Sequence, residues 1–197
     1  IKVIPGTPSD SASSDIFINE FHYDNSGSDV GEFIEVVVGP AFFGALSSAV
    51  VHLYNGKNGR SYGSSLSLDE FTPGPSNTPG LPALYFKEIS GIQNGSPDGI
   101  ALEIDGVVRE FLSYEGTFTA IDGIAAGLTS SSVGVVQGPN TPASQQSISR
   151  TGNGRIAEDF EWSIQPGNHT PGEINIGQSF GASPEPQGIG IDNLIIT

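Results

Sequence analysis

Residues 16–38 contain two extended runs joined by a short polar loop. A period of two residues is typical of a strand, because successive side chains point to opposite faces. Residues 32–38 alternate at first and end in three valines, which predict a strand covered on both faces there. We therefore expect a hairpin, or two adjacent strands, that opens a β-sandwich. In the first run the alternation predicts one side made of Phe17, Asn19, Phe21 and Tyr23, and another made of Ile16, Ile18, Glu20 and His22.

Turn-forming residues occur along the whole chain, which has 27 glycines and 14 prolines among 197 residues. This composition is typical of many short strands joined by turns, so it predicts an all-β fold. The clearest local signal lies in residues 99–114, where two alternating runs flank Asp105 and Gly106. Asp-Gly favours a type I′ turn, which needs a positive φ at both central residues. We expect a β-hairpin there.

The rest of the chain is expected to form one domain, residues 15–197, after a linker or arm at residues 1–14. Residues 72–82 predict a surface loop because their prolines lack the backbone donors of a central strand. Residues 121–127 predict one helical turn. Further strands are expected at residues 46–54, 62–68, 83–89, 132–136, 146–150 and 160–164, with a last strand within residues 188–197.

The charge balance limits the partners of this chain. Seven basic against 22 acidic residues give a net charge of −15. Direct nucleic-acid binding is not expected, because phosphate contacts need clustered Lys and Arg. No apolar run is long enough for a membrane span, and there is no cysteine for a disulfide or a thiolate metal site. The absence of methionine indicates a processed piece of a longer product, and the whole composition fits a secreted or cell-surface bacterial module.

Several motifs in a fixed order carry a family resemblance: INEF at 18–21 with GEFIEV at 31–36, LYNG at 53–56, SISR at 147–150 and TPGEIN at 170–175. Together with residues 94–102 and 112–127, they resemble lamin-tail domains, most closely the bacterial form found on secreted nucleases and other extracellular proteins. The resemblance covers residues 16–175, and residues 176–197 form an extension outside the pattern. It implies an immunoglobulin-like β-sandwich of about 8–11 short strands without catalytic machinery. Nuclear lamin tails are basic, whereas this chain is acidic, so their DNA binding is not carried over.

The loop at residues 24–32 is the candidate metal site. Calcium takes six to eight oxygen ligands, and a glycine-containing loop lets backbone carbonyls join the carboxylates. The spacing is not that of an EF-hand, and an ordinary Asx-rich turn is the alternative interpretation. Asp98 and Asp122 lie in similar glycine-flanked loops. The candidate calcium ligands are Asp24, Asn25, Asp29 and Glu32.

Other residues suggest chemistry less strongly. Glu20 and Glu35 form a carboxylate pair of the kind that glycoside hydrolysis needs, although the alternation favours solvent-facing positions for both. A zinc site needs three or four converging ligands, and His22 and His52 could meet across neighbouring strands. The only tryptophan, Trp162, is expected to be a core or edge aromatic.

Three functions remain open from the sequence. The leading hypothesis is a non-catalytic accessory domain that contacts a neighbouring catalytic or surface domain of the same polypeptide. The second is a carbohydrate-binding module for a polysaccharide, with Trp162 and Tyr54 as the ring platforms to test. The third is a small hydrolase that uses carboxylates or a metal.

Overall fold

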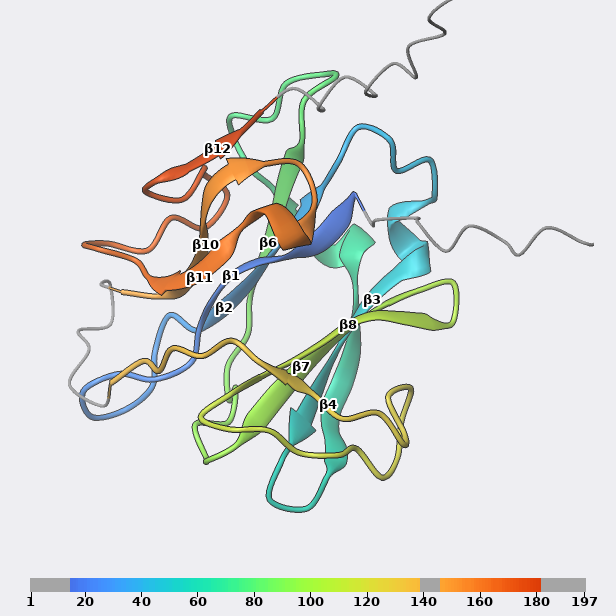
Figure 1. The fold of residues 1–197 in the computed structure, drawn as a ribbon, viewed down its shortest axis with the longest axis vertical. Helices are drawn as coiled ribbons and strands as arrows, with labels where there is room; N and C mark the ends of the chain where they lie inside the picture. The colour runs from blue at the N-terminus through green and yellow to red at the C-terminus, as the bar shows by residue number, and fades with distance from the viewer. Residues whose placement is uncertain (1–14, 139–145, 182–197) are drawn as a thin grey trace, which may run out of the picture.

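The structure is a computed structural model that describes residues 15–138 and 146–181. Within these ranges the backbone forms two β-sheets and three 3-10 helices, so the predicted all-β class is confirmed. Figure 1 shows the two sheets facing each other in a sandwich-like arrangement. None of the described helices is long or apolar enough to cross a membrane.

Sheet A has the strand order β11-β10-β1-β2-β6-β5, with β12 parallel to β10 and every other pair antiparallel. Its strands are β1 (Ile16–His22), β2 (Phe33–Val38), β5 (Thr72–Pro73), β6 (Ala83–Glu88), β10 (Ile148–Gly154), β11 (Glu161–Ile164) and β12 (Gln178–Phe180). The predicted pairing of the first two strands is confirmed, because β1 and β2 are antiparallel neighbours.

Sheet B has the strand order β4-β3-β7-β8-β9. Its strands are β3 (Ala49–Asn55), β4 (Arg60–Ser67), β7 (Asp98–Ile104), β8 (Val107–Tyr114) and β9 (Ser131–Ser132). The predicted hairpin is confirmed: β7 and β8 pair around Asp105 and Gly106, which have φ values of 50° and 79°. The 3-10 helices are η1 (Leu46–Ser48), η2 (Leu68–Glu70) and η3 (Ala157–Asp159).

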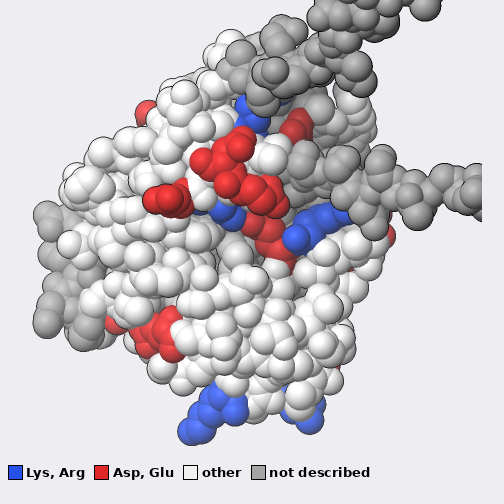
Figure 2. Space-filling view, viewed as in Figure 1, with Lys and Arg blue, Asp and Glu red and all other residues white. Residues whose placement is uncertain are grey.

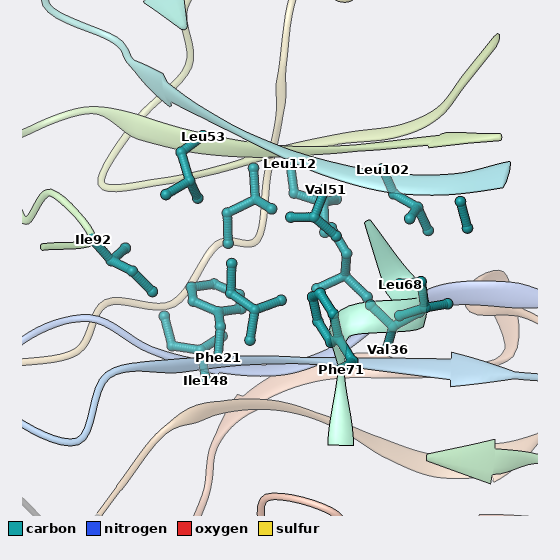
Figure 3. Close-up of a cluster of buried hydrophobic side chains, with 14 of the residues drawn as sticks. Phe21, Val36, Val51, Leu53, Leu68, Phe71, Ile92, Leu102, Leu112 and Ile148 are labelled. Atoms are coloured by element: carbon teal, nitrogen blue, oxygen red, sulfur yellow. The ribbon is translucent and has the colours of Figure 1, made fainter. Parts of the chain in front are cut away.

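The main core fills the space between the sheets. Figure 3 shows Phe21, Val36 and Ile148 of sheet A pointing toward Val51 and other side chains of sheet B. Removing this apolar surface from water is the main driving force of the fold, at about 25 cal/mol per Å². The cluster continues through Leu53, Leu68, Phe71, Ile92, Leu102 and Leu112.

A bulge in β1 changes which side chains share a face. The pairing with β2 shifts between Ile18 and Glu20, so the simple alternation across residues 16–23 was wrong. The extra residue at a bulge shifts the side-chain alternation beyond it. As a result Ile16, Ile18, Phe21 and Tyr23 all enter the main core, whereas Phe17 joins a second cluster with Val37, Leu84, Ala157 and Phe160.

Some local expectations were wrong. Residues 121–127 form no helix but hydrogen-bonded turns, closed by the Gly127 amide donating to the Ala120 carbonyl at 2.8 Å. The strand expected at residues 132–136 is reduced to the two-residue β9. The described part of the chain has twelve strands instead of 8–11, because β5, β9 and β12 are pieces of two or three residues. The arm at 1–14 and the strand expected within 188–197 lie outside the described residues.

Candidate functional site

Two carboxylates lie side by side on the outer face of sheet A. Glu20 of β1 and Glu35 of β2 are paired across the strands, and both side chains are fully buried. The expectation that they face solvent was wrong. Residues 165–178, here called the strap, cover this face and contact both carboxylates.

The strap is fastened by hydrogen bonds to this pair. Glu20 Oε1 accepts from the Ser147 hydroxyl at 2.5 Å and from the Thr170 amide at 3.0 Å, and its Oε2 lies 3.0 Å from Thr170 Oγ1. Glu35 Oε1 accepts from Asn19 Nδ2 at 2.8 Å, and Oε2 accepts from the Gly172 amide at 2.5 Å. No Lys or Arg of the described ranges hydrogen-bonds to either carboxyl group.

Burial is the main influence on the pKa of both carboxyl groups, since no Lys or Arg of the described residues pairs with them. It raises the pKa of Glu20, although the bonds from Ser147 and Thr170 act in the opposite direction. Burial raises the pKa of Glu35 well above its ordinary value, and the nearby Glu20 charge adds to the effect. Two buried like charges are costly, which is why burial raises the pKa of both carboxyl groups.

The loop at residues 24–32, here called the opening loop, contains the four candidate calcium ligands. These four side chains make different contacts in the structure. Asp24 and Asp29 are bridged by the Asn94 side-chain amide, whose Nδ2 lies 3.5 Å from Asp24 Oδ1 and 3.2 Å from Asp29 Oδ2. Asn25 points inward, because its Oδ1 accepts from the Val30 amide at 2.7 Å while its Nδ2 lies 2.6 Å from His22 Nε2. These contacts close the loop as an Asx-rich turn does.

The fourth candidate ligand, Glu32, points elsewhere. Its Oε2 accepts from the Gly91 amide at 2.7 Å, and its Oε1 is buried without a hydrogen-bond partner in the described part of the chain. Burial raises the pKa of Glu32, and the Asp29 charge adds to this. Glu32, Asp29 and Glu88 line an open hollow of about 440 Å³. Among the described residues no three His, Asp or Glu side chains converge into a group able to hold a metal ion.

Asp98 and Asp122 organise turns of their own. Asp98 Oδ1 accepts from the Gly56 amide at 3.0 Å, and Oδ2 from the Gly95 amide at 2.8 Å. Asp122 binds the start of β4, accepting from the Ser61 amide at 2.8 Å and pairing with Arg60 at 3.0 Å. Within the described part of the chain, neither carboxylate hydrogen-bonds to the loop at residues 24–32.

His22 and His52, considered as a possible zinc pair across neighbouring strands, do not meet, because β1 and β3 belong to different sheets. His22 is instead buried on the outer face of sheet A, with its ring centroid 5.6 Å from that of His169 on the strap. Burial lowers the pKa of His22, and the neighbouring His169 adds to this effect. His52 lies 2.8 Å from Glu103 on sheet B.

The two rings considered as sugar platforms have internal partners. Tyr54 is fully buried, and its hydroxyl accepts from the Ala125 amide at 3.0 Å. Trp162 is half-buried on β11, with the Arg150 guanidinium carbon 4.4 Å from its ring centroid and the Phe21 centroid at 5.7 Å. Trp162 is therefore an edge aromatic packed on the core, as expected.

The most exposed large apolar side chain of the described residues lies in a loop that sequence reasoning passed over. Phe43 is 93% exposed, whereas its neighbour Phe42 packs against the main core. Asp15 holds the base of this loop: its carbonyl accepts from the Gly39 amide, and its Oδ2 accepts from the Ala41 amide at 3.1 Å. A side chain at Gly44 would come within 2.6 Å of the Phe42 ring. The signal in the sequence that could have indicated this loop is the pair Phe42-Phe43 between Gly39 and Gly44.

Comparison of the chain with known protein families, with curated proteins and with solved structures gave no match. The lamin-tail resemblance therefore stays a prediction.

Proposed function

We propose that this chain is a non-catalytic accessory domain of a larger secreted or cell-surface bacterial protein, with an immunoglobulin-like, lamin-tail-related sandwich. Its role is to contact a neighbouring domain of the same polypeptide through the loop at residues 39–45. The single observation that carries the proposal is Phe43, a large apolar side chain held almost fully in solvent. Aromatic side chains of this kind are enriched where protein surfaces meet.

The loop is built to present Phe43 in one position. Phe42 anchors it to the core, and the Phe42 amide donates to the Gly39 carbonyl at 3.1 Å. A preorganised anchor loses little conformational freedom on binding. The loop is also tied to Asp15, the first described residue, so a domain joined through residues 1–14 would have this loop within reach.

The charge of the exposed surface is consistent with a protein partner and not with a phosphate backbone. Figure 2 shows Asp and Glu side chains gathered on one face over β10, η3 and β11. Glu158, Asp159 and Glu161 are exposed in this segment. The hydrolase alternative has little support at Glu20 and Glu35, since both are sealed under the strap.

Site-specific photocrosslinking tests the proposal. A photoreactive phenylalanine analogue replaces Phe43 in the polypeptide expressed at the full length of its gene. A matched control carries the same analogue at Val107, which is 52% exposed at the tip of the β7–β8 hairpin. We expect crosslinks from position 43 to another domain of the same chain and none from position 107. Equal crosslinking from both positions, or none from position 43, would overturn the proposal.

A groove near this loop supports polysaccharide binding as the second candidate function. A groove of about 400 Å³ beside the same loop is lined by Pro40, Tyr85, Asn77 and Thr78, among others. Apolar rings with a few polar groups are the usual lining of small-molecule sites. Retardation on polysaccharide affinity gels that is lost in Tyr85→Ala, but kept in Phe43→Ser, would favour this candidate over domain contact.

A further inference from the structure

The hydrogen bonds under the strap distinguish the two carboxyl groups. Thr170 Oγ1 has three polar neighbours: Gln165 Nε2 at 2.8 Å, Glu20 Oε2 at 3.0 Å and Asn175 Oδ1 at 3.1 Å. A threonine hydroxyl has one hydrogen to donate and two lone pairs that accept.

The orientations of the two amide groups are fixed by their other contacts. Gln165 Oε1 accepts from the Ile176 amide at 3.2 Å, so its Nε2 faces Thr170 and donates. Asn175 Nδ2 donates to the Asn19 and Arg150 carbonyls at 3.3 and 3.1 Å, so its Oδ1 faces Thr170 and accepts. The single hydroxyl hydrogen of Thr170 can go to Asn175 Oδ1 or to Glu20 Oε2, but not to both. An ionised Glu20 would therefore leave either its own Oε2 or Asn175 Oδ1 without a hydrogen at Thr170.

A neutral Glu20 completes this network. Its Oε2 hydroxyl donates to Thr170, while Oε1 acts as the carbonyl oxygen that accepts from Ser147 and the Thr170 amide. Glu35 differs, because both of its oxygens accept from donors, namely Asn19 Nδ2 and the Gly172 amide. Two accepting oxygens are the pattern of an ionised carboxylate.

We propose that Glu20 is a neutral carboxylic acid that donates a hydrogen bond to Thr170, that Glu35 carries the charge, and that deprotonation of Glu20 releases the strap. The device is a pH-sensitive latch on the outer face of sheet A. Loss of the proton leaves two adjacent buried carboxylates, with which no Lys or Arg of the described ranges pairs. Burial raises the pKa of both groups, most at Glu35, which favours one proton on the pair; its position on Glu20 is inferred from the hydrogen bonds.

The charged and titratable groups around the pair do not replace this proton. β1 contributes His22, and the strap contributes His169 and the exposed Glu173. β10 places Ser149, which carries no charge, opposite Glu20. The guanidinium of Arg150, also on β10, binds Glu110 and not the pair. β6 places Phe86, which carries no charge, opposite Glu35. Measurements at pH values above the ordinary histidine pKa of about 6.5 separate the latch from the two histidines.

Hydrogen exchange of the Thr170, Gly172 and Ile176 amides tests the latch in the whole chain. We expect their protection, corrected for intrinsic exchange, to fall by about tenfold per pH unit once Glu20 deprotonates. Glu20→Gln keeps a donor toward Thr170 and an acceptor toward Ser147, so it should keep protection high and independent of pH. Glu35→Gln turns an amide NH₂ toward a donor, so it should reduce protection at every pH.

Three results of the exchange experiment would overturn the proposal. Lost protection in Glu20→Gln with full protection in Glu35→Gln would place the proton on Glu35. Equal losses in both variants would mean that both groups are ionised. Protection in the native chain that does not change with pH would exclude a latch. The ¹³C carboxyl resonance of Glu20 in the native protein gives a readout that needs no variant: a shift typical of an ionised carboxylate at neutral pH would refute the assignment.

Discussion

Arg150 and Glu110 form a buried ion pair that joins the two sheets, with Nη2 of Arg150 2.5 Å from Oε1 of Glu110. Arg150 comes from β10 of sheet A, and Glu110 comes from β8 of sheet B. The guanidinium also donates to the Ile18 carbonyl at 2.8 Å and the Ala157 carbonyl at 2.7 Å. Glu110 Oε2 accepts from the Ile18 amide at 2.7 Å, which places both residues at the bulge of β1.

Removing one partner of this pair should be strongly destabilising. Glu110→Ala leaves the Arg150 guanidinium buried without its counter-charge and leaves the Ile18 amide without an acceptor. We expect a loss of about 3–5 kcal/mol in the free energy of unfolding, measured by urea denaturation. Glu70→Ala is the control, because Glu70 is largely exposed in its pair with Lys87 and should cost less than about 1 kcal/mol. Similar losses in the two variants would contradict the structural role of the buried pair.

The same bulge shows what sequence can and cannot predict in this chain. The Asp105-Gly106 hairpin was predictable because its turn and strands are neighbours in sequence. The bulge was not, because the Ile18 amide bonds to a carboxylate 92 residues away. The simple alternation from Ile16 to Tyr23 therefore assigned core side chains and outer side chains to the same face.

The candidate site could not be predicted from the sequence, for a similar reason. Glu20 and Glu35 were expected to face solvent, whereas both are fully buried outside the main core. Their burial depends on Thr170 and Gly172, which lie 150 and 137 residues away in the chain and belong to the strap. The Asx-rich loop, in contrast, was recognisable from its composition, because its contacts between Asn25 and Asp29 are local.

His22 should make the protein less stable at acidic pH. Its pKa is lowered from 6.5 in the folded state, so the unfolded chain binds a proton more readily. The stability it contributes is present above about pH 6.5 and is lost as the pH falls through the folded-state pKa. We expect the stability difference between the native chain and His22→Gln to shrink toward acidic pH in urea unfolding. His52→Gln, on the outer face of sheet B, should leave this pH dependence in place. A constant difference between native protein and His22→Gln would contradict the argument.

Gly74 should be intolerant of a side chain, because the strap lies against it. A Cβ at Gly74 would lie 2.2 Å from the Gly172 carbonyl oxygen, which is backbone and cannot turn away. We expect Gly74→Ala to cost about 1–3 kcal/mol, as overpacking does, and to expose the Gly172 amide to hydrogen exchange. Gly138→Ala is the control, since no atom of the described residues lies within 4 Å of its added Cβ. Equal midpoints of thermal unfolding for the two variants would show that the strap adjusts freely.

Calcium binding at the opening loop predicts a ligand-dependent rise in stability. The Asn94 amide bridges Asp24 and Asp29, and a cation bound by these two carboxylates would take its place between them. A ligand at 100 times its dissociation constant stabilises the folded state by about 2.7 kcal/mol. Thermal unfolding in EDTA, followed by millimolar calcium, should then show a midpoint raised by several degrees, and Asp29→Ala should abolish the rise. Asp105→Asn, in the distant hairpin turn, should retain it. An unchanged midpoint in the native chain would leave Asn94 as the group that holds the two carboxylates together.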